Sequence, residues 1–371
     1  MDVRFNAYKA KFDTLDSLTK DIFNSQQIDK VNIFISLDDV YWHCRNSNVN
    51  REFQCCGNLA SRQLVSNVLN LMAHYREWAV RKNVGVKVFA YYSTSSTIFY
   101  NRAFIRNYRK TYSEKSNIDN GDCYYVNSCI KDAADILKTI TQHIDSAYVV
   151  DTRKFEPAAF PCLCANEFED MKADWNFVIS KDTVEFQYAY YPRFSVIYPK
   201  GDETELLNSG NLWRFIADRE KIGSSKCKKY ASNFFPVALA IVGDKKRDIP
   251  KVKGISWRSI FGIMDDVMEK SPDLTPTAYI SAFLKECEKR KFDMDQINTN
   301  VDVLQPSFNC DTANALTKEN IKEQFIDIPD YNNLVDLNKR PDMFAECPIN
   351  IKFLTRQYAV KAVNPFKLNY S

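Results

Sequence analysis

The sequence predicts an α/β protein with a mostly parallel central sheet flanked by helices. Short runs of β-branched and aromatic residues alternate with longer stretches whose apolar residues recur at helical spacing. This alternation favours parallel strands joined by crossover helices. The chain has 371 residues, of which 45% are hydrophobic and 26% are charged. These proportions are typical of a globular protein, and the length suits one large domain or two ordinary ones.

The first expected strand, Val31–Ser36, is a β-branched and aromatic run. Residues Ser61–Val80 follow, with Leu, Val, Met and Tyr at the three- and four-residue spacing of a helix. Val86–Tyr92 is the second expected strand, and Ile130–Ile144 is the second expected helix. The chain length between the two strands leaves room for a crossover on one face of the sheet.

Two further strands are expected at Ala147–Asp151 and Trp175–Ser180, again from short apolar runs. The segment Tyr188–Tyr198 is rich in aromatic and β-branched residues, and it predicts a hairpin or a sheet edge. Ligand sites of open α/β sheets lie at the carboxyl ends of their strands. The chemistry of this chain is therefore expected at those ends.

Several function classes lack support in the sequence. No run of 18 apolar residues occurs, and the N-terminus lacks the apolar stretch of a signal peptide, so we expect no membrane span and no secretion. The 11 cysteines form no Cys-x-x-Cys pair, which fits reduced thiols in the cytoplasm or, for a viral protein, in the host cytoplasm or virion. No Walker loop, dinucleotide fingerprint or nucleophile elbow appears.

The segment from Gly243 to Ser256 resembles a motif of the 5′-3′ exonuclease and flap endonuclease superfamily. It reads Gly-Asp-Lys-Lys-Arg-Asp-Ile-Pro-Lys-Val-Lys-Gly-Ile-Ser, against the family pattern Gly-Asp-x-x-Asp-Asn-Ile-Pro-Gly-Val-x-Gly-Ile-Gly. In that family it opens a helix–three-turn–helix element that grips duplex DNA. The matching residues are Gly243, Asp244, Ile249, Pro250, Val252, Gly254 and Ile255.

Other segments follow the family's order. Phe155–Ala159, Ile179–Asp182 and Ile33–Ser36 stand where the family has carboxylate-bearing strand ends, and Phe104–Lys110 resembles the basic start of its helical arch. Tyr331–Asp342 is similar to a segment of the phage ribonuclease H branch. The resemblance covers about residues 30–345. It implies a nuclease-like core over 1–210 with an arch near 100–125, a helical DNA-binding region over 211–290, and a C-terminal extension over 291–371.

The resemblance implies phosphodiester hydrolysis with two divalent metals, Mg²⁺ or Mn²⁺, held by carboxylates from several strand ends. Many of those carboxylates are replaced here. The replacing residues are Ser36, Tyr91, Ala158, Ala159 and Arg247. Glu156, Asp182 and Asp244 remain as candidate ligands, and Asp38, Glu185 and Asp248 lie close to expected positions. Asp38 would face the same side as Ser36 if the first strand continued.

Arg247 brings a positive charge to a ligand position, where it would oppose a metal and favour a phosphate. We therefore expect a flap-endonuclease-like protein that has lost catalysis, with no cofactor, and that serves nucleic-acid binding or scaffolding. Two alternatives stay open. One is an active structure-specific 5′ nuclease or ribonuclease H with a rearranged metal site. The other is a structural subunit of a virion or polymerase assembly that does not contact nucleic acid.

Two basic clusters are candidate nucleic-acid contacts. The first overlaps the segment that resembles the family's phosphate-binding element, which in the family often holds a monovalent cation near the position of Gly254; Ser256 stands where the family has its second Gly. The second has basic residues interleaved with aromatics, which suits a single-stranded end. The residues are Lys245, Lys246, Arg247, Lys251, Lys253, Gly254, Ser256 and Arg258 in the first, and Arg102, Arg106, Arg109 and Lys110 in the second. The expected ligands are duplex or flapped DNA or an RNA–DNA hybrid, and the C-terminal extension could dock a protein assembly.

Overall fold

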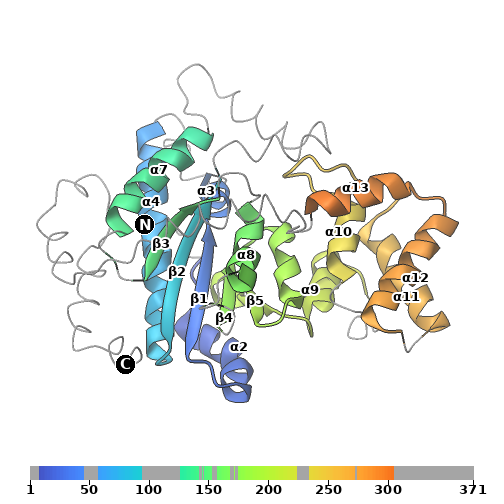
Figure 1. Cartoon of the computed structure of the whole chain (residues 1–371), viewed down its shortest axis with the longest axis horizontal. Helices are drawn as coiled ribbons and strands as arrows, with labels where there is room; N and C mark the ends of the chain where they lie inside the picture. The colour runs from blue at the N-terminus through green and yellow to red at the C-terminus, as the bar shows by residue number, and fades with distance from the viewer. Residues whose placement is uncertain are drawn as a thin grey trace, which may run out of the picture.

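The architecture combines a twisted sheet carrying helices on both faces with a further group of helices beside it (Figure 1). It is taken from a computed structural model of the whole chain. The residues that this structure describes are 8–45, 57–93, 126–141, 144, 146–152, 157–167, 171, 174–223, 234–271 and 274–304.

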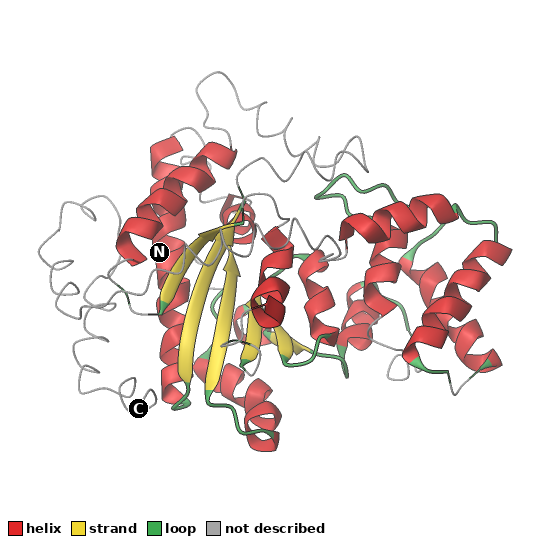
Figure 2. Ribbon diagram, in the orientation of Figure 1, coloured by secondary structure: helices red, strands yellow, loops and turns green. Residues whose placement is uncertain are grey.

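The sheet has six strands in the order β3-β2-β1-β4-β5-β6 (Figure 2). Five neighbouring strands are parallel, and only β6 runs antiparallel, against β5. The predicted fold class is thus confirmed: an α/β fold with a mostly parallel sheet flanked by helices. The strands are β1 (Lys30–Ser36), β2 (Gly85–Tyr92), β3 (Ala147–Asp151), β4 (Trp175–Ile179), β5 (Phe194–Tyr198) and β6 (Glu205–Leu207).

One face of the sheet packs against N-terminal helices. The alternate residues Ile33 and Ile35 of β1 belong to this core, together with Trp78 of the longest helix. Because the central strands are covered on both faces, nearly every residue of β1 and β2 is buried. The helices on this face are α2 (Phe12–Ser25), α3 (Leu37–Arg45), α4 (Gly57–Arg81) and α7 (Val126–Thr141).

The opposite face packs against short helical segments and is continuous with the C-terminal helices. Phe34 of β1 lies in the same hydrophobic cluster as Phe235 and Ile260. The segments are η3 (Pro157–Ala159), α8 (Phe160–Glu167), the 3₁₀ helix η4 (Thr183–Tyr190), α9 (Leu212–Arg219), α10 (Phe235–Val242), α11 (Trp257–Lys270), α12 (Pro276–Lys289) and α13 (Met294–Leu304). The short η5 (Gly201–Glu203) precedes β6.

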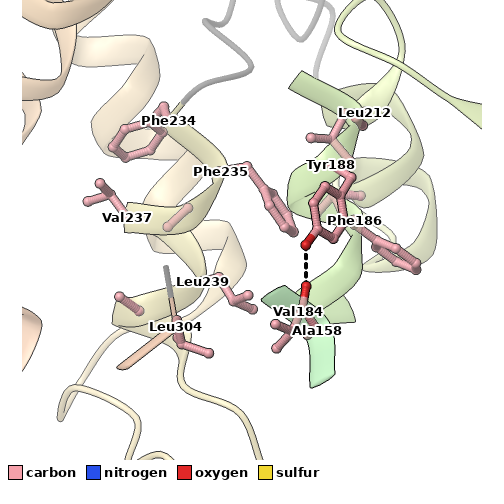
Figure 3. Close-up of a cluster of buried hydrophobic side chains, with 14 of the residues drawn as sticks. Ala158, Val184, Phe186, Tyr188, Leu212, Phe234, Phe235, Val237, Leu239 and Leu304 are labelled. Atoms are coloured by element: carbon pink, nitrogen blue, oxygen red, sulfur yellow. Dashed lines mark hydrogen bonds between the residues drawn. The ribbon is translucent and has the colours of Figure 1, made fainter. Parts of the chain in front are cut away.

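Figure 3 shows how this core joins the two groups of elements. Phe235 and Leu239 of α10 point toward Val184 and Phe186 of η4, all of them buried. The Tyr188 hydroxyl donates a hydrogen bond to the Ala158 carbonyl in the same cluster. The helices α10–α13 are therefore packed onto the sheet through shared apolar side chains.

One local expectation differs from the structure. Residues 188–190 end the 3₁₀ helix η4, so no hairpin forms within Tyr188–Tyr198; β5 is an interior strand, parallel to β4 and antiparallel to β6, so the predicted edge is wrong. Aromatic residues fill this segment because it packs against α9 and α10, where large apolar side chains serve a helix as well as a strand. In the part of the chain that the structure describes, no helix has both the length and the apolar character needed to cross a membrane.

Candidate functional site

The candidate site lies at the carboxyl ends of β1, β2 and β4. The strand register places Ser36 opposite Tyr91 and Ile35 opposite Ile179, so these three strands end at one edge. The strand β1 passes directly into α3 at Leu37. The strand ends at Ser36, as predicted, so the condition under which Asp38 would face the same side as Ser36 is not met. Asp38 is buried in the first helical turn, beside Asp39.

Asp39 accepts hydrogen bonds at one carboxylate oxygen from three donors. They are the Tyr8 hydroxyl at 2.7 Å, the Lys181 backbone N–H at 2.8 Å and the Ser180 hydroxyl at 3.3 Å. Its position in the first turn of α3 also suits a negative charge, because a helix N-terminus carries positive partial charge. Asp39 is thus bound to the end of β4 and to the N-terminal segment.

Asp182 follows β4 and caps η4, where its Oδ1 accepts the Val184 backbone N–H at 3.0 Å. Its carboxylate also meets the guanidinium of Arg247 in a two-pronged contact. Nη1 lies 3.1 Å from Oδ1, and Nη2 lies 3.1 Å from Oδ2. The Lys246 ammonium donates to Oδ2 at 2.7 Å. Both Asp182 oxygens are therefore engaged by cations of the chain itself.

The turn after α10 brings these cations to the sheet. The backbone groups of Asp244 and Ile249 bond to each other in both directions, at 2.9 and 3.1 Å, and the Asp244 side chain accepts the Lys246 N–H at 2.8 Å. Gly243 has φ 74°, and a Cβ there would lie 2.6 Å from the Ile249 carbonyl oxygen, so only glycine fits. Arg247 Nη1 also bonds to Asp244 Oδ2 at 2.7 Å.

These contacts define an ion cluster of three carboxylates and two cations: Asp39, Asp182, Asp244, Lys246 and Arg247. The Lys246 ammonium lies 4.0 Å from Asp39 and joins that carboxylate to the others. The Arg247 side chain is 4% exposed and the Lys246 side chain 28% exposed, so the guanidinium is enclosed while the ammonium reaches the rim. The cluster connects the starts of α3 and η4 with the turn after α10.

The charges of the cluster shift the pKa values of its members. Burial alone would raise the pKa of Asp182, but the Arg247 and Lys246 charges outweigh it and hold that pKa far below its ordinary value. Burial would lower the pKa of Lys246, and the charges of Asp182 and Asp39 raise it instead. Both ion-pair partners thus stay charged over the whole physiological pH range.

Glu185 behaves in the opposite way. It is buried, and burial followed by the charges of Asp182 and Asp39 raises its pKa to about 8. The Tyr91 hydroxyl donates to Oε1 at 2.5 Å, and Oε2 has no hydrogen-bond partner among the described residues. At neutral pH this carboxyl group is therefore mostly protonated and carries little charge.

The described residues do not fit a divalent metal ion. A Mg²⁺ or Mn²⁺ ion takes several carboxylate oxygens with free lone pairs. Here the oxygens of Asp182 face Lys246 and Arg247, and Glu185 is mostly neutral. Within the described ranges, no three His, Cys, Asp or Glu side chains form a group that could hold a metal. A metal at this place would meet two positive charges of the chain at close range.

The carboxylates predicted from the sequence lie at different places in the structure. Asp182, Glu185 and Asp244 come together at the edge of the sheet. Asp248 lies in the turn with φ 53°, next to Arg247. Glu156 lies outside the described residues. Ala158 and Ala159 are buried in η3 and belong to the packing of α8.

Sequence reasoning missed Asp39 and Tyr8, and it placed Lys246 only among the phosphate contacts. The adjacent pair Asp38-Asp39 after a buried strand was the signal for Asp39, whose contacts require that a helix begins at Leu37. No local pattern points to Tyr8, because its hydroxyl meets Asp39 only in the folded chain. Arg247 is 3% exposed and ion-paired, so its guanidinium does not face solvent where a phosphate would bind.

Apart from Lys246, which belongs to the ion cluster, the remaining candidate contacts of the first basic cluster face solvent. We call residues 250–258 the basic loop. Within it Lys251, Lys253 and Arg258 are exposed, as is Lys245 just before it. Apolar residues alternate with them and are buried against the helices; these are Ile249, Val252, Ile255 and Trp257. The loop therefore presents its positive side chains on a backbone that the core holds in place.

Gly254 and Ser256 lie in the part of this loop that leads into α11. Gly254 has φ 82° and open space around the place of a Cβ. Ser256 has an extended φ of −135° that any residue adopts, and it caps α11 through reciprocal bonds with Ser259. The glycine that the family has at this position is therefore not required here. The second basic cluster, Arg102, Arg106, Arg109 and Lys110, lies outside the described residues.

No protein-family model matches the chain, and no curated protein matches it. The fold is similar to solved structures of the flap endonuclease, or 5′-exonuclease, of bacteriophage T5. A crystal structure of the T5 D15 protein co-crystallised with metal ions is 13% identical, with a TM-score of 0.48, over 80% of this chain and all of the other. A zinc-bound T5 5′-exonuclease is 12% identical, with a TM-score of 0.48, over 80% and 99%. A T5 D15 flap endonuclease complex with DNA and metal ions is 14% identical, with a TM-score of 0.47, over 79% and 98%.

Proposed function

We propose that this flap-endonuclease-like protein binds duplex or flapped DNA through its basic loop and does not hydrolyse it. The observation that carries the proposal is the two-pronged contact of Arg247 with Asp182, with Lys246 beside it. Positive side chains of the chain occupy the space between the carboxylates that the sequence resemblance assigns to metal ions. The binding surface next to them remains exposed.

Loss of hydrolysis follows from what the cluster lacks. Two-metal hydrolysis requires ions that activate the attacking water and stabilise the leaving oxygen. An ammonium or guanidinium group can pair with a phosphate but does not generate hydroxide at neutral pH. Glu185, which pairs with neither cation of the cluster, has a pKa of about 8. It is therefore mostly protonated at neutral pH and cannot accept a proton as a general base. The described groups therefore offer no activated nucleophile.

Binding follows from the exposed charges. Lys245, Lys251, Lys253 and Arg258 are exposed, and none of them forms an ion pair with another described residue. Side chains of this kind contact phosphates without reading bases, so affinity should depend strongly on salt and little on sequence. The buried apolar residues between them hold the loop backbone in place, so binding costs less conformational entropy than it would for an unanchored loop.

A gel experiment tests both halves of the proposal. Purified protein is mixed with a labelled 5′-flap, a nicked duplex and an RNA–DNA hybrid, in Mg²⁺, Mn²⁺ or EDTA, and cleavage and mobility shift are read from the same samples. We expect a shift without cutting, equal in EDTA and in metal. Metal-dependent cutting that disappears with Asp182→Ala would establish the active nuclease instead. The absence of both a mobility shift and cleavage would instead favour a structural subunit of an assembly.

A matched pair of variants assigns the surface. Lys251→Ala with Lys253→Ala removes two charges from the basic loop, and Lys20→Ala with Lys285→Ala removes two exposed charges elsewhere. The first pair should weaken binding to all sequences alike and reduce the slope of log affinity against log salt by about 2. The second pair should leave both quantities unchanged. Equal effects of the two pairs would mean that binding is not located at the loop.

A further inference from the structure

The ion cluster joins three segments that are far apart in the sequence. Asp39 comes from the start of α3, Asp182 from the end of β4, and Asp244 from the turn after α10. Three carboxylates in one buried place repel one another unless cations lie between them. Lys246 and Arg247 supply those cations, and both come from the turn that leads into the basic loop.

The geometry of Arg247 is that of a bridging ion. One nitrogen, Nη1, contacts Asp182 and Asp244 together, at 3.1 and 2.7 Å, and Nη2 contacts the second oxygen of Asp182. Lys246 extends the bridge to Asp39 at 4.0 Å. A divalent cation at the carboxyl ends of strands would draw the same carboxylates together. The described chain achieves this link with its own side chains.

We propose that Lys246 and Arg247 are a built-in substitute for divalent metal, so that the protein holds its site together without any ion and becomes dependent on one when they are removed. In the wild-type cluster Lys246 and Arg247 lie against the carboxylates, and their positive charges oppose a divalent cation at close range. Without the two cations, three carboxylates and the unpartnered Oε2 of Glu185 would remain in one place. Such a set of hard oxygen ligands takes up Mn²⁺ or Mg²⁺.

The link also positions the basic loop, a step that rests on the proposed function. Only one residue, Asp248, separates Arg247 from Ile249, the first buried residue that anchors the loop. Arg247 is therefore a positioning residue: its loss should weaken DNA binding while leaving the salt slope unchanged, because no phosphate contact disappears. A phosphate-contacting residue would change the slope as well.

The deciding experiment measures thermal unfolding of the full chain without nucleic acid. Wild type, Arg247→Lys and the double variant Lys246→Ala with Arg247→Ala are each melted in EDTA and across a Mn²⁺ titration. We expect wild type and Arg247→Lys to change by less than about 1 °C, and the double variant to melt lower in EDTA and to gain roughly 3 °C or more, saturably, with Mn²⁺. Adding Asp182→Asn to the double variant should abolish that gain.

Each outcome decides. A double variant that folds and ignores Mn²⁺ overturns the proposal, and so does a wild-type protein that Mn²⁺ stabilises saturably. If the double variant does not fold, equilibrium dialysis of wild type and Asp182→Asn with Mn²⁺ decides: retention by wild type that is lost in Asp182→Asn overturns the proposal, and no retention supports it. Since no nucleic acid is present, a failure of DNA binding would contradict the proposed function and leave this result intact.

Discussion

The turn at 244–249 and the basic loop at 250–258 carry similar charges and have opposite environments. In the turn, Arg247 is enclosed and both of its terminal nitrogens bond to carboxylates. In the loop, Lys251 and Lys253 are exposed and form no ion pair with another described residue. The two segments are adjacent in the chain. The comparison shows that a basic run can divide into an internal counterion and a solvent-exposed positive surface within a few residues.

The division has a local cause. Gly243 and the reciprocal backbone bonds of Asp244 and Ile249 close a tight turn, which directs Lys246 and Arg247 back toward the sheet. Beyond Pro250 the buried side chains are apolar, so the basic residues between them can point only to solvent. Under the proposed function, the buried charges contribute to stability and the exposed ones to DNA binding. The four predictions below test that separation, from the largest expected effect to the smallest.

The first prediction is that Arg247→Ala destabilises the protein by roughly 3–5 kcal/mol, because it removes the guanidinium that pairs with both Asp182 and Asp244 and leaves the buried Asp182 with Lys246 alone. Urea unfolding measures the change. The contrasting variant, Lys251→Ala, should lie within about 0.5 kcal/mol of wild type, as exposed substitutions do. A loss below about 1 kcal/mol for Arg247→Ala would show that the enclosed pair is not a structural element.

The second prediction concerns pH and Glu185. Its folded-state pKa, about 8, lies above the ordinary value of 4.5, so the folded protein holds a proton that the unfolded chain has released. The protonated Glu185 contributes its full stabilisation below about pH 4.5, and this contribution is lost as the pH rises toward 8. Over that interval the folding equilibrium constant falls by at most about tenfold per pH unit. Glu185→Gln should remove most of that loss. Unfolding titrations between pH 5 and 9 measure it.

The control for this experiment is Glu203→Gln, an exposed carboxyl that should leave the pH profile of stability unchanged. Asp182 acts at the other end of the scale. Its pKa is lowered by the cations, so its contribution is present above its ordinary pKa and is lost as pH falls below it. Parallel profiles for wild type and Glu185→Gln between pH 5 and 8 would contradict a protonated Glu185.

The third prediction is that Tyr8→Phe costs about 1.5–3 kcal/mol, the range for a hydrogen bond to a charged acceptor, because Asp39 loses the donor at 2.7 Å. Asp39 keeps Lys181 and Ser180, so the effect should be smaller than that of Arg247→Ala. Thermal unfolding measures the loss. Tyr75→Phe removes a neutral bond of 3.4 Å to the Tyr8 carbonyl and should cost less. DNA affinity should be unchanged in both variants.

The strands and Arg247 show what could be predicted from the sequence and what could not. The strands β1–β4 were predicted to within about one residue, because short β-branched runs between helical stretches leave little choice. The motif at Gly243 correctly indicated that Arg247 belongs beside the carboxylates. What the motif could not give is burial: nothing in a basic run tells which side chains turn inward, since that depends on Asp182 and Asp39 arriving from other strand ends.

Tyr8 and β5 illustrate the same limit. Tyr8 lies 31 residues from Asp39, and no spacing rule connects them. The segment before β5 is aromatic because it packs against α10, and composition alone does not separate a buried 3₁₀ helix from a strand. Local pattern therefore predicts the elements, while the partners of each buried charge depend on tertiary contacts.

The smallest effect is expected at Ser256, where the superfamily pattern has glycine. Its extended φ needs no glycine, and its hydroxyl accepts the Ser259 N–H at 3.3 Å to cap α11. Ser256→Gly should therefore cost only a few tenths of a kcal/mol, and Ser256→Ala about 1 kcal/mol. Chemical unfolding measures both. If instead Ser256→Gly strengthens DNA binding severalfold, the serine side chain holds the backbone away from the phosphate, and the basic loop would be a weakened form of the family's contact. Equal affinity for the two variants and wild type would mean that the exposed lysines, and not this close approach, carry the interaction.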